Sequence, residues 1–200
     1  REIFEYGNQR AKIVGRENIF DFSIGNPNVP APETVTKTLL DIIQSENPAV
    51  LHGYTSAQGD AAVRKQIADN LNSRFATSFR PENFYMTVGA AASLCCCLNG
   101  LCNPGDEVIV FAPFFPEYRV FIEGAGAKMT MIPADIEAFQ IDFTAFEAAI
   151  NEKTKLITIQ RSKGYQTRPS FSVKQIGELI RFVKSIKPNV ICMVDNCYGE

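Results

Sequence analysis

Apolar residues recur along this chain with two spacings, and the two alternate over most of its length. Short apolar runs bounded by turn-forming residues predict β-strands; they cover residues 20–24, 84–88, 107–111, 127–132, 155–160 and 190–194. Between them, apolar residues at helical spacing predict helices, which cover residues 32–45, 59–75, 90–101, 144–150 and 172–186. Residues 113–124 predict a loop followed by a helix. Strands that alternate with helices predict β-α-β units and a mainly parallel sheet.

Polar residues at the predicted helix ends support this division. Thr144 is followed by Glu147, and Ser172 is followed by Gln175, which is the spacing of a capping box at a helix start. Pro188 ends the second of these helices. The first twenty residues predict a helix or an arm.

The carboxyl ends of the predicted strands are the first place to look for function, because open parallel sheets bind ligands there. Gly89, the loop 112–118, the loop 161–169 and Asp195 all follow strands directly. Gly89 also opens a helix, whose exposed amides and partial positive charge suit a phosphate group. A glycine required only for packing is the alternative interpretation.

Asp195 and Tyr198 form the most informative pair in the chain. Asp195 ends an apolar strand, and an ionised, partly buried carboxylate there can pair with a protonated pyridine nitrogen. Tyr198 can bond a ring hydroxyl, Phe115 can stack on a planar ring, and Tyr54 can donate to a phosphate. The alternatives are an exposed strand-end acid, a core phenylalanine and half-buried tyrosines.

Composition narrows the class of protein. The chain has 200 residues, of which 46% are hydrophobic and 21% charged, as in a globular domain. A net charge of −2 without a basic block argues against nucleic acid and anionic membranes as partners, and no apolar run reaches the roughly 18 residues of a membrane span. Cys95, Cys96 and Cys97 are consecutive and point in different directions on a helix. We therefore expect no metal site and predict thiols in a reducing cytoplasm.

Taken together, these features resemble the fold-type I pyridoxal-phosphate enzymes, specifically the class I/II aminotransferases. The resemblance runs from about residue 20 to residue 155. It rests on the segments 22–27, 52–54, 87–91, 103–108 and 113–115, together with Gly59 and Arg64.

The resemblance implies a fold, a cofactor and a set of binding residues. The fold is a three-layer α/β sandwich, with an N-terminal arm and small-domain segment at 1–45 and a partial large domain at 46–200. The cofactor is pyridoxal 5'-phosphate, whose phosphate lies against Gly89, Ala90 and Ala91 and whose ring stacks on Phe115.

The same resemblance assigns the remaining contacts and the partners. Asp195 and Tyr198 hold the ring nitrogen and the ring hydroxyl, Tyr54 reaches the phosphate of a neighbouring subunit's cofactor, and Gly25 lies near the substrate carboxylate. Such enzymes are homodimers that act on an amino acid and a keto acid.

The match changes character after the fourth strand of the large domain. Residues 160–170 lack the Asn-x-Pro-x-Asn-Pro-x-Gly loop of the aminotransferases. Together with residues 190–200 they resemble the methionine-γ-lyase-like proteins sometimes labelled aluminium-resistance proteins. The two resemblances meet near residues 151–158, which favours a chimera or a join. Arg161 and Arg168 can bind an anionic group or remain solvated loop charges.

No lysine follows Asp195, where the resemblance would place the imine-forming residue. Lys163 lies in a strand-end loop, and we expect it at the surface. The sequence as it stands therefore predicts little or no transaminase activity and favours a truncated aminotransferase-like chain. Three alternatives stay open: a carbon–sulfur lyase fragment, a non-catalytic pyridoxal-phosphate-binding domain, and a doubly wound domain that binds another phosphate ligand at Gly89.

Overall fold

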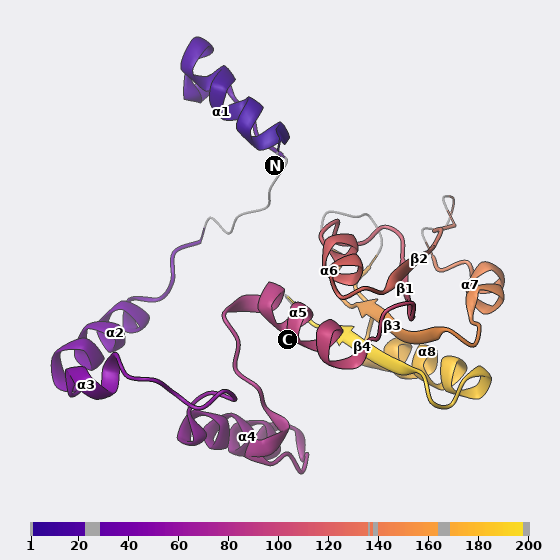
Figure 1. The fold of residues 1–200 in the computed structure, drawn as a ribbon. Coiled ribbons are helices and arrows are strands. Elements are labelled where there is room, and N and C mark those ends of the chain that lie inside the picture. Colours follow the sequence, from indigo (N-terminus) through magenta and orange to yellow (C-terminus); the bar gives the residue numbers. More distant parts are fainter. Residues whose placement is uncertain (1, 23–28, 136, 138–139, 164–168, 198–200) are drawn as a thin grey trace. The chain divides into compact units, whose positions relative to one another are not determined.

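The computed structural model describes the chain except for residues 1, 23–28, 136, 138–139, 164–168 and 198–200 (Figure 1). It divides into two compact units, Arg1–Thr55 and Ser56–Glu200.

The first unit is helical. It contains α1 (Glu2–Val14), the 3-10 helix η1 (Arg16–Asn18), α2 (Glu33–Ser45) and α3 (Pro48–Leu51). The predicted helix at 32–45 is thus confirmed as α2. The described part of the predicted strand at 20–24 is not a strand, and its remainder lies outside the described residues. None of the described residues of this unit is buried, so they form no hydrophobic core among themselves.

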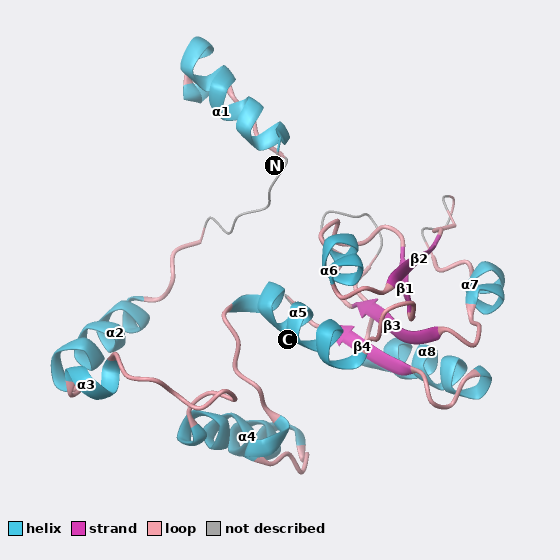
Figure 2. Ribbon diagram, viewed as in Figure 1, coloured by secondary structure: helices cyan, strands magenta, loops and turns pink. Residues whose placement is uncertain are grey.

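The second unit is an α/β structure with an all-parallel sheet (Figure 2). Its strands are β1 (Glu107–Phe111), β2 (Lys128–Ile132), β3 (Thr154–Gln160) and β4 (Ile191–Asp195), in the spatial order β2-β1-β3-β4. Its helices are α4 (Ala61–Phe75), η2 (Pro81–Asn83), α5 (Gly89–Leu101), α6 (Tyr118–Gly124), α7 (Phe143–Ala149) and α8 (Val173–Ile186). The parallel sheet confirms the α/β class that the alternating pattern predicts.

Two hydrophobic clusters flank the sheet and make it the middle of three layers. On one face, Leu94 and Leu98 of α5 and Ile122 of α6 pack with Leu156 of β3. On the other face, α7 and α8 pack against residues that include Ile157 of β3. Leu156 and Ile157 are both fully buried, because successive side chains of a strand point to opposite faces. The three-layer prediction is confirmed.

A predicted strand of the second unit is also absent. Residues 84–88 form a loop between η2 and α5, and Val88 is 96% exposed. Met86 donates one backbone hydrogen bond to Gln58 O, at 3.0 Å, but no strand of the described residues pairs with this segment. An apolar run favours burial, but a strand also needs a neighbour that completes its backbone hydrogen bonds.

The two capping predictions have different outcomes. Ser172 Oγ accepts from Gln175 N, and Gln175 Oε1 accepts from Ser172 N, so the capping box of α8 is confirmed. At α7, however, Asp142 is the N-cap and accepts from Ala145 N at 2.9 Å. The predicted box at Thr144 is wrong, since an aspartate two residues earlier already satisfies the first amides.

Candidate active site at the carboxyl edge of the sheet

The carboxyl ends of β1, β3 and β4 bring the strand-end residues together at one edge of the sheet. Gln160 and Asp195 are register partners at the ends of β3 and β4. Arg161 N donates to Asp195 O at 2.9 Å, which extends the strand pair by one residue. Phe115 N donates to Gln160 Oε1 at 3.0 Å, so the loop after β1 is fastened to the same edge.

Asp195 is held by a buried tyrosine. The Tyr118 hydroxyl donates to Asp195 Oδ2, and Asp195 Oδ1 accepts from Cys197 N at 3.0 Å. Tyr118 is only 2% exposed, and this burial raises the pKa of its phenol, with a further rise from the hydrogen bond to Asp195. The phenol therefore stays protonated as a donor, and it fixes the direction of the carboxylate.

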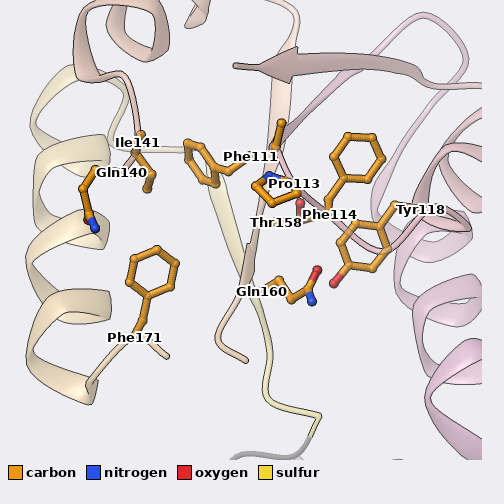
Figure 3. A pocket seen from close by; sticks show the side chains of 10 residues that line it. Phe111, Pro113, Phe114, Tyr118, Gln140, Ile141, Thr158, Gln160 and Phe171 are labelled. Carbon is orange, nitrogen blue, oxygen red and sulfur yellow. The ribbon is translucent and has the colours of Figure 1, made fainter. Parts of the chain in front are cut away.

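Phe115 lies beside this pair and keeps part of its surface open. It is 40% exposed, and its ring meets the Tyr118 ring edge-on, with centroids 5.8 Å apart and planes at 86°. A cavity lies at the ends of β1 and β3; it is lined by Phe111, Ala112, Pro113, Phe114, Tyr118, Gln140, Ile141, Thr158, Gln160 and Phe171 (Figure 3). Figure 3 shows the amide end of Gln160 directed toward the Tyr118 hydroxyl.

The helix start at Gly89 reaches the same edge. Helix α5 packs beside the sheet in one cluster with Tyr118, and it ends shortly before β1 begins, so it runs opposite to the strands. Its N-terminus therefore lies where the strands end. Gly89 has φ +79°, a left-handed conformation that favours glycine, and an added Cβ would meet no atom within 4 Å. No side chain of the described residues caps α5, and Ala90 and Ala91 are exposed.

Not all the predicted site residues can be placed at this edge. Tyr54 is fully exposed and belongs to the first unit, whereas the edge belongs to the second. Gly25, Tyr198 and Arg168 lie outside the described residues. Lys163 is exposed in the loop after β3.

Arg161 is engaged in the fold. Its Nε donates to Phe171 O at 3.2 Å, and its Nη1 donates to Asn196 Oδ1 at 2.9 Å. The sequence offered two interpretations of Arg161, an anion ligand and a solvated loop charge. Neither of them includes these hydrogen bonds.

Sequence reasoning missed Tyr118 and Gln160. Tyr118 follows Phe115 by three residues and is the first residue of α6, and Gln160 is the last residue of β3. The available signal was that Gln160 ends one strand and that Tyr118 closes the segment 112–118 that follows another. Within the part of the chain that the structure describes, no group of three or more His, Cys, Asp or Glu could hold a metal ion. Likewise, no described helix is long and apolar enough to cross a membrane.

The three-layer fold is that of the fold-type I pyridoxal-phosphate enzymes. Within that class, the methionine gamma-lyase family model matches residues 69–200, and the chain belongs to this family.

Two similar proteins illustrate the range of relatives: one is named as an aminotransferase, and the name of the other gives no activity. An aspartate aminotransferase of Sulfolobus acidocaldarius is 31% identical over 187 residues, which cover 90% of this chain and 44% of the relative. The protein YnbB of Bacillus subtilis is 43% identical over 116 residues, 52% of this chain and 27% of the relative. The chain thus spans about half the length, or less, of the curated relatives it matches.

Solved structures show the same fold over nearly the whole chain. An amino transferase from Eubacterium rectale has a TM-score of 0.84 and 44% identity, and covers 97% of this chain and 49% of its own. The aspartate aminotransferase of Thermotoga maritima has a TM-score of 0.80 and 25% identity, with 98% and 51% coverage. The family match covers residues 69–200, and the aspartate aminotransferase of Sulfolobus acidocaldarius aligns over 187 residues, so neither resemblance is confined to one side of residues 151–158.

Proposed function

We propose that this chain is part of a pyridoxal-phosphate-dependent aminotransferase-like enzyme that acts on an amino acid and a keto acid. The observation that carries the proposal is Asp195, at the end of β4, with its carboxylate directed by the buried Tyr118 hydroxyl. Phe115 is fastened to the end of β3 beside it, and the uncapped start of α5 at Gly89 supports the phosphate assignment.

The residues at this edge fit the cofactor in three ways. The carboxylate of Asp195 suits a protonated ring nitrogen, the partly open face of Phe115 suits a planar ring, and the uncapped amides of Gly89, Ala90 and Ala91 suit a phosphate. When bound, pyridoxal phosphate serves as the electron sink for a carbanion at the amino-acid Cα.

Each protein group has one task in this proposal. Asp195 keeps the proton on the ring nitrogen, and Tyr118 holds that carboxylate in place. Phe115 covers one face of the ring and excludes water from it. The amides at the start of α5 hold the phosphate end.

The remaining assignments belong to the same proposal. Tyr198 bonds the ring hydroxyl, Gly25 lies near the substrate carboxylate, and Tyr54 reaches the phosphate in a partner subunit of a cytoplasmic homodimer. Residues 1–45 form an arm and a small-domain segment, and residues 46–200 form part of the large domain. No lysine among residues 1–200 forms the imine, so these residues bind the cofactor but need a lysine from elsewhere for turnover.

A carbon–sulfur lyase is the second candidate, supported by the methionine gamma-lyase family match. The two reactions differ in their products. An aminotransferase converts an added keto acid to an amino acid. A lyase needs no added keto acid and splits one sulfur-containing amino acid, with water, into a thiol, ammonia and a keto acid.

The test uses the intact protein with pyridoxal phosphate, a panel of amino acids, and separate assays for the two product sets. We expect keto-acid-dependent amino transfer, and we expect Asp195→Asn to lower its rate about 100-fold or more. Glu123→Gln, on the exposed side of α6, is the control and should leave the rate unchanged. Borohydride reduction should trap no lysine within residues 1–200. An imine at Lys163, or an unchanged rate in Asp195→Asn, would contradict the proposal.

A further inference from the structure

Gln160 and Arg161 occupy the end of the strand that lies between the two walls of the candidate site. In the sheet, β3 has β1 on one side, which leads to Phe115, and β4 on the other, which ends in Asp195. Gln160, the last residue of β3, and Arg161, the residue after it, therefore lie between the two walls.

Gln160 makes the contact on the Phe115 side. Its Oε1 accepts a hydrogen bond from Phe115 N at 3.0 Å, across 45 residues of sequence. This bond fixes the backbone that carries the Phe115 ring, while the ring itself stays 40% exposed. The contact is made through the backbone amide, so it would persist if the Phe115 side chain were removed.

Arg161 makes the contacts on the Asp195 side. Its backbone N donates to Asp195 O at 2.9 Å, and its Nη1 donates to Asn196 Oδ1 at 2.9 Å. Its Nε donates to Phe171 O at 3.2 Å, which ties the return of the 161–171 loop to the same point. The Asp195 carbonyl and the side chain of the next residue, Asn196, are thereby fastened to the residue that follows β3.

We propose that Gln160 and Arg161 are a pair of positioning residues that set the separation between the Phe115 ring and the Asp195 carboxylate. This inference rests on the proposed function, because the two walls need a fixed separation only if one flat ring stacks on the first and bonds the second. The donor–acceptor distance of a hydrogen bond to the ring nitrogen can vary by only a few tenths of an ångström. A functional site keeps its geometry within about 0.5 Å. Neither Gln160 nor Arg161 needs to touch the cofactor.

A double-mutant cycle in the intact protein tests the Gln160 half of the proposal. The variants are Gln160→Leu, Phe115→Ala and their combination, and the measurements are the Kd for pyridoxal phosphate and the visible circular dichroism per bound cofactor. We expect Gln160→Leu to raise the Kd about tenfold, as for the loss of one aligned hydrogen bond, and to change the dichroism. In the Phe115→Ala background the same change should have no further effect on either quantity.

A matched series separates positioning from a general loss of stability. Gln160→Glu keeps an acceptor oxygen at the same length and should restore the dichroism of the original protein. On the other wall, Arg161→Met should raise the Kd in the original protein but not in the Asp195→Asn background. Arg181→Met, which removes an exposed arginine from α8, is the control and should change neither quantity.

The outcomes distinguish this inference from the proposed function. If the intact protein binds no pyridoxal phosphate, both proposals are wrong. If it binds the cofactor but the effects of Gln160→Leu and Phe115→Ala on the Kd are additive, the positioning role alone is overturned. Unchanged visible circular dichroism in Gln160→Leu would also overturn the positioning role alone.

Discussion

Glu107, the first residue of β1, is buried, and three neighbouring side chains donate hydrogen bonds to its carboxylate. Asn151 Nδ2 donates to Oε2 at 2.8 Å, Lys128 Nζ lies 3.1 Å from Oε1, and Thr130 Oγ1 donates to Oε2 at 3.4 Å. The hydrogen bond from Asn151, followed by that from Lys128, holds the pKa of Glu107 below its ordinary value. Folding therefore favours the ionised form of this carboxyl group.

We expect Glu107→Gln to lower the free energy of unfolding by about 1 kcal/mol at pH 7, because a charge-assisted hydrogen bond becomes a neutral one. A lowered pKa contributes stability above the unfolded-state value of about 4.3, and that contribution is lost as the pH falls through the folded-state value. The difference between the two proteins should therefore shrink below about pH 4.3. Denaturant unfolding at a series of pH values measures it.

Glu123→Gln is the matched control, because Glu123 is an exposed glutamate paired with Arg119 on α6. It should change stability by less than about 0.5 kcal/mol at any of these pH values. A gap between Glu107→Gln and the original protein that stays constant down to pH 3 would contradict the role given to Glu107.

Single residues of the site could be predicted only where their position relative to a strand puts them at the carboxyl edge of the sheet. Phe115 lies in the loop after β1 and Asp195 ends β4, and the carboxyl-edge rule for parallel sheets was enough to select them. Tyr118 and Gln160 have the same kind of position, but their importance comes from partners 77 and 45 residues away. Sequence spacing carries no information on such pairs, because the fold alone brings them together.

At the scale of elements, helix starts depend on which residue first satisfies the free amides. In α8 the capping box of Ser172 and Gln175 forms as the sequence predicts. In α7 both Asp142 and Thr144 were available, and Asp142 caps the helix. A motif match cannot choose between two overlapping candidates, since both satisfy the local pattern.

This difference gives a test with an internal control. Ser172→Ala and Asp142→Ala should each lower the free energy of unfolding by about 1 kcal/mol, because each removes the side chain that accepts from the first helical turn. Thr144→Ala should change it by less than about 0.5 kcal/mol, because Thr144 is exposed and does not cap the helix. Thermal or denaturant unfolding measures all three. A larger effect for Thr144→Ala than for Asp142→Ala would support the capping box predicted from the sequence.

The elements also show what an apolar pattern can and cannot predict. The runs that became β1 to β4 have partners on the sheet, and their periodicity located them within a few residues. The run at 84–88 has a similar composition and forms a loop. Hydrophobic patterning reports a preference for burial, whereas strand formation also depends on a neighbouring strand, which lies elsewhere in the sequence.

At the scale of the whole α/β unit, specific contacts join segments on both sides of residues 151–158. Gln160 binds the backbone of Phe115, and Tyr118 binds Asp195. Lys187 Nζ donates to Asn151 O and Glu152 O at 2.8 Å each. The junction predicted near residues 151–158 thus shows no break in the packing, as expected for a structure whose local and tertiary preferences agree.

The sheet should also join its two hydrophobic clusters into one cooperative unit. Leu156 and Ile157 are adjacent in β3, fully buried, and belong to clusters on opposite faces. In the intact protein, Leu156→Ala and Ile157→Ala should each lower the free energy of unfolding by about 2 to 5 kcal/mol, whereas Val120→Ala, at an exposed site of α6, should have little effect. Hydrogen exchange tests the coupling: each core variant should weaken amide protection in α6 and α8 by the same amount. Loss of protection on one face only would show that the two layers unfold independently.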